Sequence, residues 1–293
     1  MSSAPTPPDR YALVGHPVSH SWSPFIHGLF ARATLQHIQY RLIDVASDRF
    51  RAEAGQFFFD GGKGLNVTIP HKQAAAEFVN ELTPRAAEAE AVNTISRTPS
   101  GELVGDNTDG VGLVIDLEDN LRIALEGKRV LILGAGGATR GVVGPILARR
   151  PAILAIANRT VARAELIAAS FAGRGTVLAS GFDSIEPGAF DLVINATAAG
   201  HEGHAPPIPA TTVAAHTVCY DMAYSPGDTP FSQWAVAHGA SATYKGWGML
   251  VEQAAEAFQV WRGIRPQTRH VLELLTRKGH DGVRIIPPGG TGP

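Results

Sequence analysis

One short segment in the middle of the chain limits the possible folds more than any other. Arg129–Leu133 (RVLIL) is a nearly continuous apolar run of strand length, and Gly134–Gly137 turns directly into a helical pattern that reaches Arg149. Strands without polar alternation are typical of parallel sheets, which are buried on both faces. Because Ile153–Ala157 is a second such run, the sequence predicts a strand–turn–helix–strand unit of a doubly wound α/β domain.

The same alternation of strands and helices extends along most of the chain. Predicted strands are Tyr11–Gly15, Ile38–Val45, Gly64–Ile69, Val92–Arg97, Glu102–Gly105, Leu192–Asn195 and Val218–Met222. Predicted helices are Ser23–Ala33, Asp48–Phe59, Pro70–Asn80, Asp109–Ala124, Val161–Ala172, Met249–Arg262 and Gln267–Arg277. Ser23 is the predicted N-cap of the first helix, ahead of Pro24. Pro99-Ser100-Gly101 predicts a hairpin.

Chain length and this pattern together predict two α/β domains with a cleft between them. A chain of 293 residues suits two domains at about 100–200 residues each. The change of pattern after Asp109 places the first domain at residues 1–109 and the Rossmann-like second domain at 110–247. The Pro- and Gly-rich ends, residues 1–9 and 278–293, are predicted to be flexible tails.

Charge and cysteine content exclude several classes of protein. Lys and Arg number 25 against 27 for Asp and Glu, a formal net charge of −2, so no basic surplus indicates a nucleic acid or an anionic membrane as partner. The single cysteine, Cys219, excludes an internal disulfide and a multi-cysteine metal site, and we expect no metal. Without a membrane-length apolar run or a signal peptide, we expect a cytoplasmic enzyme.

The glycine turn after RVLIL predicts a dinucleotide site. Gly134-Ala135-Gly136-Gly137-Ala138 lies between a strand and a helix, where backbone N–H groups and the positive helix end can face a pyrophosphate. Thr139 occupies the position of the usual third glycine. An ordinary tight turn between strand and helix is the alternative interpretation.

The end of the next strand favours NADP over NAD. NAD enzymes usually carry an acid there for the ribose hydroxyls, whereas this chain has Asn158-Arg159-Thr160. Arg159 offers a planar cation that can pair with a 2′-phosphate. A solvated surface arginine is the alternative.

Polar clusters in the first domain follow predicted strand ends, where open α/β sheets bind ligands. They are His20-Ser21-Trp22-Ser23-Pro24, Asn66-Val67-Thr68 with Lys72, Asn93-Thr94 and Gly105–Asp109. Each also has a purely structural interpretation, namely helix capping, a solvated lysine or turn chemistry. A Lys–Asp pair can exchange a proton with a carbonyl oxygen while hydride arrives at carbon, but spacing alone does not bring Lys72 and Asp109 together.

At these residues the chain resembles the shikimate dehydrogenase family, from Val14 to Trp261. The matching segments are Gly15-His16-Pro17, His20–Pro24, Asn66–Lys72, Ala91–Thr94, Gly105–Gly110, Gly134–Ala138, Asn158–Thr160, Ile194–Thr197, Tyr220–Met222, Thr229–Phe231 and Gly248–Gln253. Each segment is weak alone, whereas the ordered set is specific.

The resemblance implies NADPH-dependent reduction of 3-dehydroshikimate to shikimate in aromatic amino-acid biosynthesis. It implies that Lys72 is the acid/base residue and Asp109 its partner. It further implies a substrate site with Ser21 and Ser23 at the carboxylate, Thr68, Asn93 and Gln253 at hydroxyl groups, Asn66 shaping the loop, and Tyr220 near both carboxylate and nicotinamide. The implied cofactor residues are Gly134–Ala138, Asn158, Arg159, Thr160, Thr197, Met222, Gly246 and Met249. In the family, the closing helices, here 248–277, pack back on the substrate domain.

Two departures and several alternatives accompany the resemblance. Ala198 replaces a common serine, and Lys245-Gly246-Trp247 replaces a short acidic turn, which leaves details of cofactor affinity open. A quinate/shikimate dehydrogenase using NAD or NADP is the nearest alternative. A non-catalytic ligand sensor would need an additional DNA-binding region or a lost Lys/Asp pair. A reductase for an unrelated ketone would keep the glycine turn and lack the first-domain set. A homodimer is a further candidate assembly.

Overall fold

The computed structural model describes residues 6–197, 203–225 and 227–280. The chain divides into two compact units, each treated by itself below. The first unit extends to Thr108 and also contains Gln253–Glu273, whereas the second contains Asp109–Glu252 and resumes at Leu274. No helix in the described ranges has the length and apolar character needed to cross a membrane.

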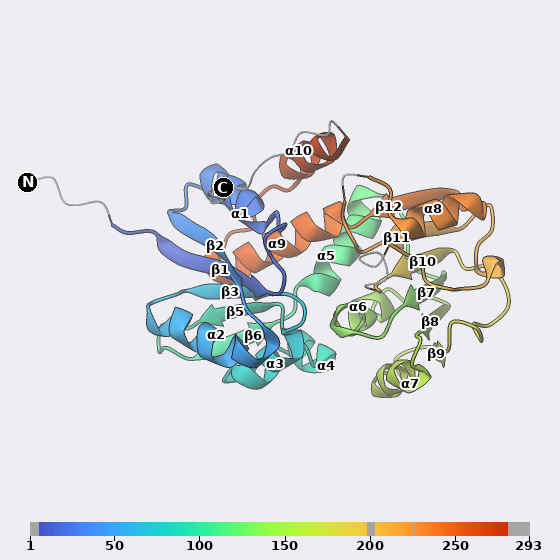
Figure 1. The fold of residues 1–293 in the computed structure, drawn as a ribbon, viewed down its shortest axis with the longest axis horizontal. Helices are drawn as coiled ribbons and strands as arrows, with labels where there is room; N and C mark the ends of the chain where they lie inside the picture. The colour runs from blue at the N-terminus through green and yellow to red at the C-terminus, as the bar shows by residue number, and fades with distance from the viewer. Residues whose placement is uncertain (1–5, 198–202, 226, 281–293) are drawn as a thin grey trace, which may run out of the picture. The chain divides into compact units, whose positions relative to one another are not determined.

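The first unit is a six-stranded sheet with helices on both faces (Figure 1). Its strands are β1 (Asp9–Gly15), β2 (Ile38–Asp44), β3 (Gly64–Val67), β4 (Glu81–Leu82), β5 (Thr94–Arg97) and β6 (Leu103–Asp106). Its helices are α1 (Ser23–Ala33), the 3₁₀ turn η1 (Ser47–Arg49), α2 (Phe50–Phe59), α3 (Lys72–Phe78) and α4 (Pro84–Ala89). The strand order is β2-β1-β3-β5-β6-β4. Antiparallel pairing of β5 with β6 confirms the predicted hairpin.

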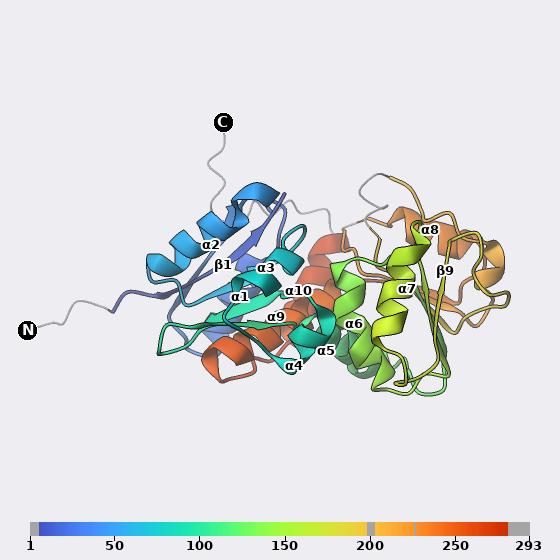
Figure 2. The ribbon, with the colours of Figure 1, turned by 90° about the horizontal axis from the view of Figure 1, so that it is seen from below.

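Alternating side chains of the first sheet face two different layers. Ala12, Val14 and Leu65 join a buried cluster with the phenylalanines of α2. Tyr11, on the opposite face of β1, stacks near Trp261 of α9 (Trp247–Arg262). Figure 2 shows α2 and α3 covering one side of this sheet. The period of two along β1 therefore places Ala12 and Val14 in the core under α2 and Tyr11 in the layer that contains Trp261.

The second unit is an all-parallel sheet of order β12-β11-β10-β7-β8-β9. Its strands are β7 (Arg129–Leu133), β8 (Ile153–Ala157), β9 (Val177–Ser180), β10 (Leu192–Asn195), β11 (Val218–Asp221) and β12 (Ala242–Lys245). Its helices are α5 (Asp109–Ile115), the π-helical turn η2 (Asp116–Asn120), α6 (Gly137–Leu147), α7 (Val161–Ser170), the 3₁₀ turn η4 (Ala210–Thr212) and α8 (Pro230–Ala237). The order reverses at β7, as in a dinucleotide-binding sheet, and confirms the predicted fold class.

Residues of β7 alternate between two cores. Val130 and Ile132 pack with α5, α6 and α7, whereas Leu131 and Leu133 pack with α8 and the segment before β11. Full burial on both sides explains why this strand has no polar alternation.

Several boundaries differ from the predictions. The predicted helix Asp109–Ala124 ends at Asn120 after the π-helical turn. The strands β4, β9 and β12 and the helices α4 and α8 are not among the predicted elements. Residues 278–280, predicted to lie in the tail, close α10 (Arg269–His280). The rest of that tail, residues 281–293, and residues 1–5 and Ala198 lie outside the described ranges.

Candidate active site

Candidate residues of the first unit meet at one edge of its sheet. β3 pairs antiparallel with β5, so Asn66 at the end of β3 lies beside Thr94 at the start of β5. Thr94 in turn lies beside Asp106 at the end of β6. The carboxyl ends of β3 and β6 and the amino end of β5 therefore share this edge, although 40 residues separate Asn66 from Asp106.

The loop after β1 holds the predicted carboxylate anchors. Ser21 and Ser23 are buried, and the Ser21 hydroxyl donates to the Ser23 hydroxyl at 3.1 Å. The prediction that Ser23 caps α1 is wrong: Trp22 holds the N-cap position without a side-chain bond. Instead, the Ser23 backbone N–H donates to Ser21 Oγ at 3.2 Å. Two hydroxyls and the start of a helix thus lie together, a donor set suited to a carboxylate.

Asp44, at the end of β2, ties this loop to the sheet. Its carboxylate binds the His16 ring at 2.5 Å and accepts from the Val18 N–H at 3.1 Å. These hydrogen bonds, that of His16 first, lower the pKa of Asp44.

Lys72 lies at the first position of α3 and is half-buried. The start of α3 is fixed by His71, whose N–H donates to the Thr68 carbonyl at 2.9 Å. The His71 ring also hydrogen-bonds the Val45 carbonyl at 2.7 Å. A cation at a helix start opposes the helix dipole, so Lys72 at this position costs a little stability.

Amide and hydroxyl side chains from three segments form one network at this edge. Asn93 donates through Nδ2 to Thr108 Oγ1 at 2.9 Å and, more weakly, to Gln253 Oε1 at 3.5 Å. The Thr108 backbone N–H donates to Asn93 Oδ1 at 2.8 Å, and the Thr108 hydroxyl donates to the Gln253 carbonyl at 3.1 Å. The network brings Gln253 of α9 to residues about 150 positions earlier in the chain.

Asp109 follows this network directly, at the start of α5, and is buried. The loop leading to it is held by Asp106, which accepts two hydrogen bonds from Arg85, both at 2.6 Å. Asp106 also accepts from the Thr83 hydroxyl and the Asn107 N–H, each at 2.7 Å. Burial opposes ionisation of Asp106, but these donors outweigh it and lower its pKa.

The glycine turn of the second unit fits a pyrophosphate. Gly134 has φ +102°, and Gly136 holds the N-cap position of α6. A Cβ at Gly136 would meet no atom within 4 Å, so the space beside this helix start is open. Thr139, in place of the usual glycine, is buried and donates to the Gly134 carbonyl at 2.9 Å. The residues present therefore fit the dinucleotide that the motif predicts.

The end of β8 presents basic residues to solvent. Asn158 donates to the Thr160 carbonyl at 2.8 Å, which shapes the turn. Arg159 and Thr160 are exposed, as is Arg163 one helical turn later. Arg163 is absent from the predicted site, although its spacing from Arg159 could have indicated it.

The other predicted cofactor residues follow the remaining strands of the second sheet. Thr197, after β10, donates to Asn195 Oδ1 at 2.7 Å. The Met222 N–H, after β11, donates to the Asn195 carbonyl at 2.9 Å, and Gly246 follows β12. Met249 packs into the core beside α5 and α6 with 7% of its surface exposed.

Tyr220 does not have the predicted role, because its side chain belongs to the core of the second unit. The ring is fully buried, and its hydroxyl donates to Asp116 at 2.7 Å. Burial, with the neighbouring Asp116 charge, raises the Tyr220 pKa well above its ordinary value. Tyr224, four residues later and beyond the end of β11, is half-buried beside Trp247. Tyr220 lies within β11 and is buried, whereas Tyr224 lies beyond the end of that strand and is partly exposed.

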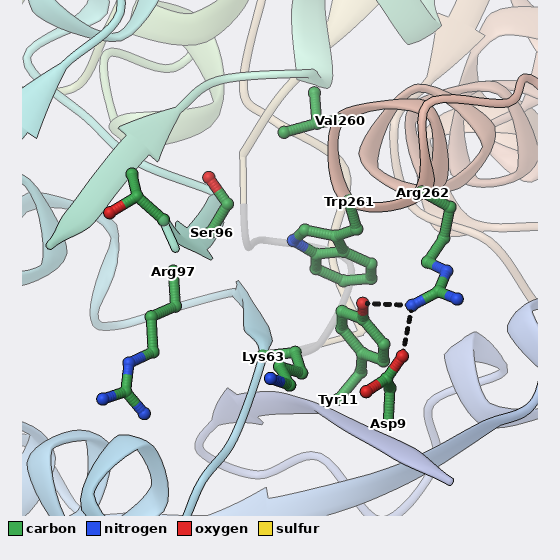
Figure 3. Close-up of a pocket in the computed structure, with 9 residues that line it drawn as sticks. Asp9, Tyr11, Lys63, Ser96, Arg97, Val260, Trp261 and Arg262 are labelled. Carbon is green, nitrogen blue, oxygen red and sulfur yellow. Dashed lines mark hydrogen bonds and ion pairs between the residues drawn. The ribbon is translucent and has the colours of Figure 1, made fainter. Parts of the chain in front are cut away.

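A pocket in the first unit lies away from these residues (Figure 3). It has a volume of about 410 Å³ and is lined by Asp9, Tyr11, Lys63, Ser96, Arg97, Thr98, Val260, Trp261 and Arg262. Asp9, Tyr11 and Lys63 lie at the amino ends of β1 and β3, the opposite end of these strands from Asn66 and Thr68. None of the predicted site residues lines it.

Comparisons with known proteins extend over both units. Residues 13–95 match the family described as "Shikimate dehydrogenase substrate binding domain". Residues 117–203 match "Shikimate / quinate 5-dehydrogenase", and residues 246–276 match "Shikimate 5'-dehydrogenase C-terminal domain".

Individual relatives cover nearly the whole chain. A shikimate dehydrogenase (NADP(+)) from Aeromonas hydrophila is 53% identical over 269 residues, which is 92% of this chain and 98% of the relative. The crystal structure of an Ael1 enzyme from Pseudomonas putida is 43% identical with a TM-score of 0.84, covering 92% of this chain and 98% of that one. The structure of a shikimate 5-dehydrogenase from Thermus thermophilus, in complex with NADP(H) and shikimate, is 29% identical with a TM-score of 0.80. It covers 92% of this chain and 99% of that one.

Proposed function

The chain belongs to the shikimate dehydrogenase family, and we propose that its two units bind shikimate and NADP in the roles that their motifs indicate. The protein is an NADP-dependent oxidoreductase that interconverts 3-dehydroshikimate and shikimate, a step of aromatic amino-acid biosynthesis. The residue roles below are our proposal.

The observation that carries the proposal is the hydrogen-bonded network at the sheet edge. Asn66, Asn93 and Gln253 come from β3, the start of β5 and α9, yet one set of hydrogen bonds joins them. Amides fixed in this way suit a polyhydroxylated ligand, because their orientation does not have to be set when the ligand binds. Ser21 and Ser23 add hydroxyls for the carboxylate, and Thr68 adds another at the end of β3.

Lys72 is the proposed acid/base residue. Its ammonium donates a proton to the ketone oxygen of 3-dehydroshikimate, and the neutral amine takes the proton back from the shikimate hydroxyl in the reverse direction. Asp109, a buried carboxylate at the start of α5, is its proposed partner in proton transfer. When bound, NADPH supplies the hydride for the carbonyl carbon.

Proposed cofactor contacts follow the carboxyl edge of the second sheet. Gly134–Ala138 and the start of α6 hold the pyrophosphate through backbone N–H groups. Asn158, Arg159 and Thr160 hold the 2′-phosphate end, with Arg163 as an addition from the structure. The set is completed by Thr197, Met222, Gly246 and Met249. Tyr224, beyond the carboxyl end of β11, takes the place of the buried Tyr220.

The first test is turnover by the purified enzyme. Shikimate and quinate are each assayed with NADP and with NAD, and formation of reduced nicotinamide is followed by absorbance. We expect shikimate with NADP to give the highest kcat/KM. Because one matched family covers both shikimate and quinate dehydrogenases, quinate is the specific competitor. Turnover of quinate without shikimate would overturn the substrate assignment.

A pair of lysine variants tests the acid/base role. Removing a general acid/base group typically lowers the rate by roughly 10²–10⁴, so Lys72→Ala should lose about that much kcat, and Asp109→Asn should change kcat in the same direction. Lys63→Ala is the matched control, because Lys63 is an exposed lysine at the other end of β3. If Lys72→Ala behaves like Lys63→Ala, the assignment of Lys72 is wrong.

We also propose a cytoplasmic location and a homodimer, with neither a membrane nor a nucleic acid as partner. Cell fractionation tests the location, and sedimentation equilibrium tests the assembly. A monomer at micromolar concentration would contradict the homodimer.

A further inference from the structure

We propose that Tyr40 is a positioning residue for the substrate site, acting through Asn66 on the amides that hold the substrate. The inference rests on the proposed function, because it takes Asn66, Asn93 and Gln253 as parts of the shikimate site. Tyr40 lies on the edge strand β2 and matches none of the motif segments.

Strand register brings Tyr40 within reach of Asn66. Tyr40 pairs with Tyr11 on β1, and Leu13, two residues later on β1, pairs with Asn66 on β3. Residues two apart share a sheet face, so Tyr40 and Asn66 lie on the same face with one strand between them. Two strand spacings amount to about 10 Å, which a tyrosine and an asparagine can span together. The Tyr40 hydroxyl donates to Asn66 Oδ1 at 2.7 Å.

From Asn66 a chain of hydrogen bonds leads to Gln253, and each donor along it points the same way. Asn66 Nδ2 donates to Thr94 Oγ1 at 3.2 Å and to the Asn93 carbonyl at 3.3 Å. The Thr94 hydroxyl donates to Asn93 Oδ1 at 2.9 Å. Asn93 then donates to Gln253 Oε1, as described above.

The direction of donation along these hydrogen bonds defines the role that we propose for Tyr40. An amide that donates from nitrogen on one side and accepts at oxygen on the other has one favourable orientation. Tyr40 supplies the donor to Asn66 Oδ1 from outside the site, and so helps to select the orientation in which Asn66 Nδ2 faces Asn93 and Thr94. Chains of hydrogen bonds polarise one another, so the effect extends to Asn93.

His27 holds the Tyr40 ring in place. The two rings stack with centroids 4.3 Å apart and planes 9° apart. His27 is fully buried beside Tyr40. Burial lowers the pKa of His27 to about 3, so the ring is neutral near pH 7 and serves as a flat stacking surface.

Tyr40→Phe tests the inference, because it removes the hydroxyl and keeps the stacked ring. One neutral hydrogen bond contributes about 0.5–1.5 kcal/mol, or roughly 2- to 13-fold in affinity. We expect the KM for shikimate to rise about 3- to 10-fold, while the KM for NADP stays nearly constant. The thermal midpoint should fall modestly, because the buried Asn66 oxygen loses a donor. Tyr11→Phe is the matched control: the Tyr11 hydroxyl accepts from Arg262 at 3.2 Å, and its ring lies 4.7 Å from that of Trp261 (Figure 3). The control should leave both KM values unchanged.

A double mutant separates positioning through Asn66 from a general effect on stability. In the Asn66→Ala background, Tyr40→Phe should add no further rise in the KM for shikimate, because its partner is absent. The inference is overturned if the two effects multiply, if Tyr40→Phe raises both KM values equally, or if it behaves like Tyr11→Phe. Absence of shikimate turnover in the unmodified enzyme would instead refute the proposed function, and this inference with it.

Discussion

Replacing Arg85 by methionine should lower the free energy of unfolding of the first unit more than removal of an exposed ion pair would. The Arg85 guanidinium donates through Nε and Nη2 to the two oxygens of Asp106, both at 2.6 Å, and through Nη1 to Glu256 at 2.9 Å. Asp106 is 6% exposed and Arg85 29% exposed. Methionine keeps most of the apolar stem and removes the charge and the planar fork.

The expected loss is about 3 kcal/mol in the free energy of unfolding. Removing one partner of a buried ion pair typically costs 3–5 kcal/mol, because the remaining charge stays buried. The lower end applies here, since Asp106 keeps its bonds from Thr83 and Asn107. Glu256 likewise keeps Arg265, at 2.6 Å.

The deficit should depend on pH. The pKa of Asp106 is lowered in the folded protein, because hydrogen bonds from Arg85 and Thr83 and the charge of Arg85 outweigh the opposing effect of burial. A lowered folded-state pKa gives stability that is present above the unfolded-state value of about 4 and is lost as the pH falls through the folded-state value. Without Arg85, burial raises the folded-state pKa of Asp106. The difference between the proteins should therefore be full above that raised value, begin to shrink as the pH falls through it, and continue to shrink toward the lowered pKa of the unmodified protein.

Urea unfolding at pH 7 and at pH 3.5–4.5, followed by tryptophan fluorescence, measures both effects. Arg150→Met is the matched control, because its pair with Glu126 at 2.7 Å is 80% and 69% exposed and exposed pairs contribute little. A loss below about 1 kcal/mol, the range of exposed pairs, or a deficit that does not change with pH would refute the reasoning.

Three further variants test the cofactor choice, the carboxylate anchor and the corrected tyrosine. Arg159→Ala should raise the KM for NADP roughly 10- to 100-fold, because a hydrogen bond to a charged group contributes about 1.5–3 kcal/mol; the KM for NAD should stay constant, and equal weakening of both would contradict the role. Replacing Ser21 and Ser23 together by alanine should raise the KM for shikimate and leave that for NADP, as initial rates will show. Tyr220→Phe should cost about 1–3 kcal/mol, measured by urea unfolding, because buried Asp116 loses a donor; a changed KM for shikimate with unchanged stability would restore Tyr220 to the site.

The sequence alone determined the elements whose burial is complete or whose termini carry strong signals. The predicted bounds of β7, β8 and β10 agree with the structure, because full burial on both faces leaves an uninterrupted apolar run in the sequence. The edge strands β9 and β12 are half-exposed throughout and were not predicted. β12 (ATYK) has no apolar run, whereas β9 (VLAS) begins with three apolar residues, a signal that the sequence does contain. Thr83-Pro84 and Thr229-Pro230 start α4 and α8 with the threonine as N-cap, a signal that the sequence does contain.

Some features of the candidate site were likewise predicted from the sequence, whereas others were evident only in the tertiary structure. Motifs predicted its residue types, and the resemblance implied their roles, because both depend on order along the chain. Only the tertiary structure placed Tyr220 in the core, since its partner Asp116 is 104 positions away. It alone joined Tyr40 to Asn66, because that bond follows from the register of three strands. Contacts between distant segments depend on how the sheet is ordered and packed, and no local pattern in the sequence records that arrangement.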